Sequence, residues 1–213
     1  MTSFRIFAKT TLGLYFGLAC MQAHSQTGSG HGSRHNAPIN CDQLHIEGKA
    51  SSALNAVTLP PTQTCTTRTS NGFPIPDPSC TPGAVNPTVT LDVLQDTKFR
   101  TRCVRDQATT EHDKTVTYDW YKTKHPSHNS GASQTCELDH LVSLELGGAD
   151  TLDNIWPQCG PHGVGLPKRF FKQKDLVENF LASEVRAGRM SLNEAQKGIA
   201  KDWTQFLADA KKH

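Results

Sequence analysis

The residue types that could do chemistry are concentrated in residues 136–158. An aspartate and a histidine are adjacent at Asp139 and His140, ahead of an apolar run, and Asn154 follows a glycine-rich turn. A carboxylate suits a hard divalent cation, which can stabilise charge on a phosphate and on a leaving oxygen. Histidine titrates near neutral pH and can take a proton from water. This pattern indicates phosphodiester hydrolysis, with Asp139 holding a metal and His140 acting as general base.

The local geometry of the pair sets a condition on this interpretation. Adjacent side chains on a strand point to opposite faces. Asp139 and His140 can therefore serve one centre only at a strand end or in a bent segment. An Asp-His pair also has many structural uses, so the surrounding residues have to decide whether it is a site.

These surroundings resemble the signature of HNH, or ββα-metal, nucleases. The similarity rests on the Asp139-His140 pair, the Gly147-Gly148 element and the segment Asn154-Ile-Trp-Pro. In that family the pair ends the first strand, a loop leads to the asparagine, and a helix supplies the last metal ligand. The resemblance implies that Asp139 binds the metal, that His140 is the general base, and that Asn154 holds the loop against the backbone near His140.

The similarity extends to small exported or phage-linked HNH-like proteins. The fold that it implies is α+β: a ββα-metal centre with a C-terminal helical hairpin and a loop-rich N-terminal part stapled by disulfides. The cofactor that it implies is a divalent metal ion, Mg²⁺ in the first place, with Mn²⁺ or Zn²⁺ as alternatives. The similarity covers residues 80–207, through the segments Cys80–Ala84, Asn154–Pro157, Lys174–Glu178, Ser191–Gln196 and Trp203.

The sequence departs from the family pattern at the last metal ligand. The expected position falls on Gly163, and His162 is one residue short of it. Three interpretations stay open: His162 is the ligand after a loop adjustment, Glu178 replaces it, or the site is incomplete and inactive. Lys174 and Glu178 lie four residues apart within an apolar stripe, so they either form an ion pair at its edge or face the active-site cleft.

Substrate contacts are expected from local charge, because the net charge of +2 is close to neutral. No base-reading motif is visible, so cleavage of DNA, or alternatively RNA, should show little sequence specificity. A catalytically inactive exported binding module that retains the ββα scaffold is the alternative function. The expected phosphate contacts are a basic cluster just after the motif, for which a solvated helix face is the alternative: Lys168, Arg169, Lys172 and Lys174.

The N-terminal residues have the layout of a secretory signal. Arg5 and Lys9 precede an apolar segment at 11–20, and small residues lead to a cleavage point after Ser25. The apolar run is too short to span a membrane, so we expect no stable membrane association after cleavage. A lipoprotein signal ending at Cys20 is the alternative. The expected location is secreted or periplasmic.

Composition divides the rest of the chain into three parts. Residues 26–40 are rich in Ser, Gly, His and Asn, and we expect a disordered linker after the signal peptide (1–25). Residues 41–79 are expected to form a loop-rich disulfide module, because prolines and an Asn-Gly pair interrupt every apolar run. Residues 80–213 are expected to form the nuclease domain.

Six cysteines remain after the signal, which is typical of disulfides in an exported protein. The residues alone leave their pairing open. Matching HNH-like proteins often lack counterparts of Cys136 and Cys159, whereas counterparts of Cys80 and Cys103 recur. The resemblance therefore implies the pairs Cys136–Cys159 and Cys80–Cys103, which leaves Cys41–Cys65.

Two helices are expected at the C-terminal end. Apolar positions between residues 168 and 187 fall on one helical face, and Gly188 is a typical stop. Ser191 and Glu194 predict a capping box for a second helix, whose apolar stripe continues to Ala210. The two helices should pack as a hairpin on the catalytic unit.

Overall fold

The structure is a computed structural model that describes residues 41–47, 64–105 and 110–213. The expected signal peptide (1–25) and linker (26–40) lie outside the described residues, as does the middle of the expected disulfide module. Among the helices that are described, none is both long and apolar enough to cross a membrane.

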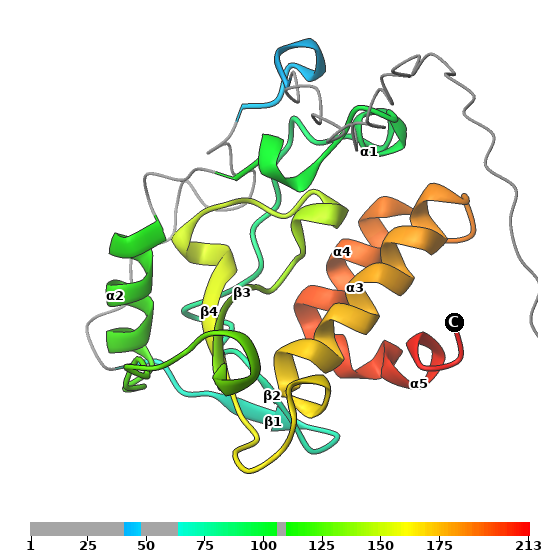
Figure 1. Ribbon diagram of the computed structural model, residues 1–213. Coiled ribbons are helices and arrows are strands. Elements are labelled where there is room, and N and C mark those ends of the chain that lie inside the picture. The colour runs from blue at the N-terminus through cyan, green and yellow to red at the C-terminus, as the bar shows by residue number, and fades with distance from the viewer. Residues whose placement is uncertain (1–40, 48–63, 106–109) are drawn as a thin grey trace, which may run out of the picture. The chain divides into compact units, whose positions relative to one another are not determined.

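The Asp-His pair ends the first strand of a β-hairpin. Strand β3 (Cys136–His140) pairs antiparallel with β4 (Ile155–Cys159), from Cys136 opposite Cys159 to His140 opposite Ile155 (Figure 1). Pro157 is tolerated in β4 because each strand of a two-stranded sheet has one edge without ladder hydrogen bonds. The register places the two cysteines and the histidine at opposite ends of the hairpin.

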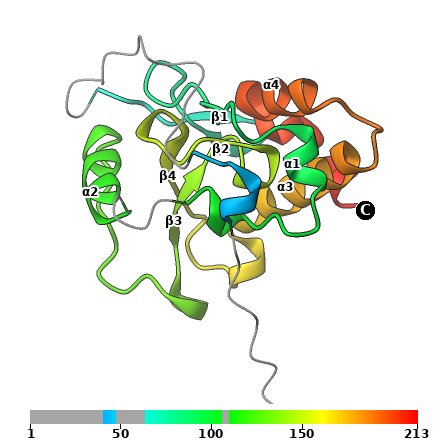
Figure 2. The ribbon, with the colours of Figure 1, turned by 90° about the horizontal axis from the view of Figure 1, so that it is seen from above.

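Helices cover the hairpin on two sides. Helix α3 (Phe170–Arg186) follows β4 along the chain and packs on both strands, whereas α2 (Thr110–Trp120) packs on β4 from the other side (Figure 2). Residues 115–121 belong to α2 and the turn after it. The order of elements is thus strand, strand, helix in a mixed α and β structure.

The second C-terminal helix begins where the sequence predicts. The Ser191 side chain accepts a hydrogen bond from the Glu194 backbone N–H at 3.2 Å, and α4 (Leu192–Asp202) follows this cap. The preceding helix ends at Arg186, and Gly188 adopts a left-handed φ of 71°. Both helix boundaries therefore follow from local sequence signals.

The expected continuation of that helix to Ala210 is wrong. Asp202 is extended and its side chain accepts a hydrogen bond from the Thr204 N–H at 2.9 Å, which starts a new turn. The chain continues as a 3-10 helix (Trp203–Phe206) and a short helix α5 (Leu207–Ala210). A local side-chain cap has interrupted an apolar stripe that would otherwise extend the helix.

The largest core lies between α3 and the elements after it. The residues that it gathers are mostly aliphatic, with Trp203 as the one large aromatic ring fully withdrawn from solvent. The apolar face of α3 supplies one wall, and α4 and α5 supply the other. Its buried members from the C-terminal part are Val177, Leu181, Ala182, Val185, Ala195, Ile199, Trp203, Leu207 and Ala210.

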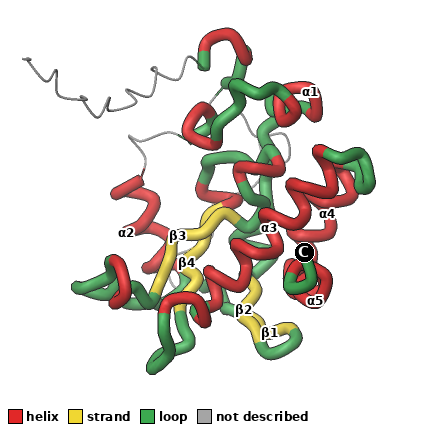
Figure 3. The backbone as a smooth tube through the Cα atoms, turned by 45° about the vertical axis from the view of Figure 1, so that its right-hand side comes forward, coloured by secondary structure: helices red, strands yellow, loops and turns green. Residues whose placement is uncertain are grey.

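The N-terminal part packs on these same elements. A second hairpin pairs β1 (Arg68–Ser70) with β2 (Phe73–Ile75) (Figure 3). It contributes Ile75 to the core. The Trp203 indole N–H donates to the Pro74 carbonyl at 3.0 Å. Helix α1 (Leu91–Gln95) lies against α3. The described residues on both sides of position 80 therefore share one core.

Two of the three expected disulfides are wrong. Cys136–Cys159 is present as expected, but the others are Cys41–Cys103 and Cys65–Cys80. The expected pairs Cys80–Cys103 and Cys41–Cys65 do not form, because residues 64–80 turn back on themselves while Cys41 reaches the turn after α1. Both observed bridges cross the boundary expected between residues 79 and 80. Three disulfides also agree with an oxidising environment.

Replacing Trp203 by alanine should lower the free energy of unfolding by about 3–5 kcal/mol, since it removes a buried ring and its hydrogen bond. Urea denaturation of the oxidised protein measures this cost. Leu176→Ala is the control, because Leu176 of α3 is 40% exposed and its loss should cost less than about 1 kcal/mol. Equal costs for the two substitutions would contradict the described core.

Candidate active site

Both members of the Asp-His pair reach one cavity at the end of β3. This cavity, which we call the acidic cavity, has a volume of about 150 Å³, and Asp139, His140 and Glu178 line it. Asp139 and His140 are the last two residues of the strand. The strand end thus satisfies the geometric condition that the sequence set for a shared centre.

The His140 imidazole is held by a second carboxylate. Its Nε2 lies 2.7 Å from Asp150 Oδ1, and both side chains are buried. An ionised carboxylate can only accept, so Nε2 donates and Nδ1 is left as the basic nitrogen. A carboxylate in this position also stabilises the imidazolium that forms when the ring takes a proton. This is the arrangement that a general base needs.

Lys174 of α3 occupies the centre of a buried charge cluster. Its side chain is 0% exposed, and its ammonium lies 3.1 Å from Asp139 Oδ2 and donates to the His140 carbonyl at 2.7 Å. The same ammonium forms an ion pair with Glu178. Burial alone would lower the pKa of Lys174, but Asp139 and Glu178 outweigh it and raise that pKa. The lysine therefore stays charged and ties α3 to the end of β3.

The carboxyl groups around this lysine also have raised pKa values. Burial raises the pKa of Asp139 and of Glu178, although the Lys174 ammonium opposes the shift in both. Burial also raises the pKa of Glu137, which lines the same cavity. One ammonium thus faces more carboxylates than it can neutralise, and the surplus negative charge favours binding of a further cation.

The donor chemistry fits a hard divalent cation. Asp139 Oδ2 is buried and accepts no hydrogen bond, although it forms an ion pair with the Lys174 ammonium, and Glu178 offers a second carboxylate on the same cavity. Across the described ranges, no group of three or more His, Cys, Asp or Glu residues is placed to hold a metal ion. Mg²⁺ is commonly bound by one or two carboxylates, with waters and substrate phosphates as the other ligands. Asp139 and Glu178 would suffice for that mode.

His162 is not placed where the first interpretation of the last ligand needs it. It is exposed, and it follows Cys159, which lies at the far end of the hairpin from His140. The two ends of the five-residue strand are four steps apart, or roughly 13 Å at a rise of about 3.3 Å per residue. The structure brings Glu178, and not His162, to Asp139.

Two of the four residues in the expected phosphate-binding cluster are buried. Lys174 is enclosed as described, and the Arg169 guanidinium donates to the Pro161 carbonyl. Lys172 is half-buried and forms an ion pair with Asp175 at 2.6 Å. Lys168 is exposed but precedes α3, at the far end of the hairpin. No shared basic surface results.

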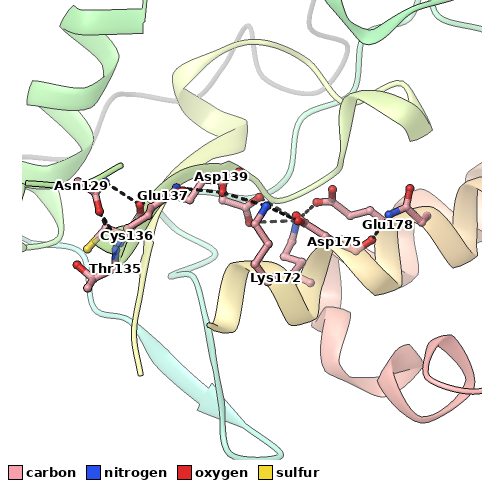
Figure 4. A network of polar contacts seen from close by, with 11 residues as sticks. Asn129, Thr135, Cys136, Glu137, Asp139, Lys172, Asp175 and Glu178 are labelled. Carbon is pink, nitrogen blue, oxygen red and sulfur yellow. Dashed lines mark hydrogen bonds and ion pairs between the residues drawn. The ribbon is translucent and has the colours of Figure 1, made fainter. Parts of the chain in front are cut away.

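A polar network connects β3 to α3 along the side of this cluster. The Asn129 amide donates to the Cys136 carbonyl at 2.8 Å, and Lys172 reaches Glu137 Oε2 at 3.9 Å (Figure 4). Figure 4 shows the network running from the loop before β3 through the strand to Asp175 on the helix. The strand that carries Asp139 is therefore held at its start as well as at its end.

Asn154 fixes the loop between the two strands. Its amide donates to the Val142 and Ala149 carbonyls at 2.9 and 2.8 Å, and its oxygen accepts from the Val142 N–H at 2.9 Å. Gly148 allows this close approach, because a Cβ there would collide with the Val142 carbonyl oxygen. These contacts hold the loop against the backbone that follows His140.

Two residues of the site were missed from the sequence. Asp150 follows the glycine turn closely, and its spacing from His140 could have suggested an orienting carboxylate. No pattern in the sequence marks Arg105 as a residue of the site. It is exposed, pairs with no described carboxylate, and lines both the acidic cavity and a neighbouring cavity of about 360 Å³ together with His140. Its free guanidinium is suited to a phosphate beside the imidazole.

Comparison of the chain with protein-family models, with curated proteins and with solved structures found no match.

Replacing Asn154 by alanine should destabilise the protein, because it leaves the Val142 N–H and two carbonyls buried without partners. Each unsatisfied group costs about 1–3 kcal/mol. Thermal or urea unfolding measures the loss. Asn179→Ala is the matched control, since Asn179 is exposed on α3. A loss for Asn154→Ala no larger than that for Asn179→Ala would contradict this role.

The raised pKa values of Asp139 and Glu178 predict an unusual pH dependence of stability. The folded state holds these protons more tightly than the unfolded chain. The stability that this tighter proton binding contributes is therefore fully present below about pH 4, where the two groups titrate in the unfolded chain. It is lost as the pH rises through their raised pKa values in the folded state.

The substitution Glu178→Gln isolates the contribution of Glu178 to this pH dependence, because glutamine does not titrate. Urea unfolding in EDTA at several pH values should show that the variant gains stability relative to the wild type as the pH rises from about 4 towards neutrality. The comparison cancels the contributions of Asp77 and Asp202, whose lowered pKa values act in the opposite sense. Parallel pH profiles for the two proteins would refute the shift.

Proposed function

We propose that this protein is an exported, metal-dependent endonuclease of the HNH type. Its substrate would be DNA, with RNA as the alternative, cleaved with little sequence specificity. The observation that carries the proposal is the His140–Asp150 pair at the end of β3, in contact with a cavity that Asp139 and Glu178 also line. A positioned base beside clustered oxygen donors is what hydrolysis of a phosphodiester requires.

The metal would be held by Asp139 and Glu178, with Mg²⁺ as the expected ion. When bound, such a cation stabilises negative charge on the phosphate and on the leaving oxygen. Lys174 keeps the two carboxylates close together, because both contact its single ammonium. It also accounts for part of their negative charge, so the cation would bind a cluster that already contains one positive group.

His140 would take the proton from the attacking water at Nδ1. Asp150 keeps Nε2 protonated and stabilises the imidazolium that results. Arg105 would bind the phosphate from the solvent side of the same cavity. Asn154 contributes by fixing the loop whose backbone follows His140 directly.

Export is supported by two observations. The three disulfides are typical of an oxidising compartment. The N-terminal residues have the layout of a secretory signal. The protein would therefore act in the periplasm or outside the cell.

The test of activity is nicking of supercoiled plasmid by the oxidised protein in Mg²⁺ or Mn²⁺. His140→Ala should lower the rate by roughly 10²–10⁴-fold, the usual contribution of a general base. His162→Ala is the matched control and should retain full activity, because its imidazole is exposed at the far end of the hairpin. Absence of nicking by the wild type, or equal nicking by His140→Ala, would overturn the assignment.

The same assay separates the two candidates for the last metal ligand. Glu178→Gln should lose activity and bind Mn²⁺ more weakly in calorimetry, whereas His162→Ala should change neither. Asp139→Asn should behave like Glu178→Gln. The reverse pattern, with His162→Ala inactive, would show that the loop of residues 160–169 moves to the site.

A catalytically inactive binding module is the second candidate function. It is favoured by Lys174, whose ammonium already contacts both carboxylates that a metal would use. Tight DNA binding in EDTA without cleavage would support it. Loss of binding on removal of metal would count against it.

A further inference from the structure

A third cavity lies beside the acidic cavity and is lined by arginines. It has a volume of about 370 Å³, and we call it the arginine cavity. Arg100 and Arg102 come from the turn after α1, and Arg186 comes from the last turn of α3. Glu145 is the only carboxylate among the described residues that line it. Three guanidinium groups therefore face one negative charge.

These guanidinium groups are not neutralised by the described residues. Arg100 donates to the carbonyl groups of Thr97 and Phe99, and Arg186 donates weakly to the Leu94 carbonyl at 3.4 Å. All three arginines are exposed, and none pairs with a carboxylate in the part of the chain that is described. A backbone carbonyl leaves the charge of a guanidinium uncompensated, so the cavity favours an anion.

The elements that carry the arginines are firmly held. Cys103 closes their turn through the disulfide to Cys41, and Phe99 and Val104 are buried on either side of it. The Gln95 amide donates to the Arg186 carbonyl at 3.1 Å, which joins α1 to the end of α3. The two sources of positive charge therefore keep a fixed relation to each other.

The arginine cavity adjoins the candidate active site. Thr101 and Glu145 line both the arginine cavity and the acidic cavity. Arg105 and His140 line both the acidic cavity and the 360 Å³ cavity. The three cavities therefore form one row, with His140 between its ends.

The length of this row exceeds one nucleotide. Glu178 and Arg186 are eight residues apart on α3, which is about 12 Å along the helix axis. The axial rise per nucleotide of a strand in a duplex is about 3.4 Å. A phosphate at His140 and an anion at the arginine cavity would therefore belong to different nucleotides of one strand.

We propose that the arginine cavity is a subsite for a backbone phosphate of a polynucleotide strand whose scissile phosphate lies at His140. Guanidinium groups recognise phosphate oxygens without reading bases, so the subsite positions the strand and adds no sequence preference. It takes the role first expected of the basic cluster at residues 168–174. This inference rests on the proposed nuclease function for the identity of the strand, but its test does not depend on cleavage.

Binding of a fluorescein-labelled single-stranded oligonucleotide is measured by anisotropy in EDTA at low salt. Arg100→Gln, Arg102→Gln and Arg186→Gln should each weaken binding several-fold. Each should also reduce the slope of log affinity against log salt by about 0.7, the value for one phosphate contact on a single strand. Two oligonucleotides of unrelated sequence should bind equally.

Arg68→Gln is the matched control, because Arg68 is an exposed arginine of β1 that lines none of the three cavities. It should leave the affinity and the salt slope unchanged. Thermal unfolding of every variant confirms that the fold is retained. Unchanged binding in all three arginine variants, an equal loss in Arg68→Gln, or affinity that follows base sequence would overturn the subsite.

Hydrolysis of bis(p-nitrophenyl) phosphate by the wild type in Mn²⁺ reports separately on the proposed function. This diester is too small to reach from His140 to the arginine cavity. Failure of the wild type to hydrolyse it would count against the nuclease, while the salt slopes would still decide whether the arginines bind a strand.

Discussion

The ammonium of Lys174 is the one charge on which the geometry of the candidate site depends. It is withdrawn from water at a cost of several kcal/mol, and the contacts with Asp139, Glu178 and the His140 carbonyl have to offset that cost. These three partners come from two elements, the end of β3 and the middle of α3. The lysine therefore fixes how the strand sits on the helix, and it does so at the residues that carry the chemistry. Because it neutralises only part of the negative charge around it, the cluster retains its attraction for a cation.

The hairpin that carries Asp139 and His140 is held at its two ends by different kinds of contact. A covalent bridge joins Cys136 to Cys159 at one end, and the Asn154 amide holds the intervening loop at the other. Neither contact involves a residue that lines the acidic cavity. Together they restrict the motion of β3, which carries His140 and Asp139. A rigid strand keeps a catalytic group within reach of the proton that it transfers.

Local patterns predicted the parts of the structure that depend on neighbouring residues. The apolar face of α3 and the Ser191 cap follow from periodicity and capping, whereas the strand ending in His140 was expected only from the resemblance to HNH nucleases. Contacts between distant segments were not predictable in this way. Arg100 and Arg186 line one cavity although their positions in the chain are far apart, and no local signal marks either. The bridge between Cys41 and Cys103 depends on the path of the intervening chain, which pairing rules do not contain. Lys174 was recognised as anomalous within its stripe, but the direction it faces required the structure.

The bridge between Cys136 and Cys159 also separates the hairpin from residues 160–169. Substitutions can accumulate at different rates in these two regions of the chain. Residues 160–169 leave the hairpin beyond this bridge and rejoin the fold at the start of α3. Arg169 is buried in this segment, but His162 and Gly163 are exposed, and they lie at the far end of the hairpin from His140. These two exposed positions are open to insertions. A lineage of this protein could acquire new surface contacts there while the reaction centre stayed as it was.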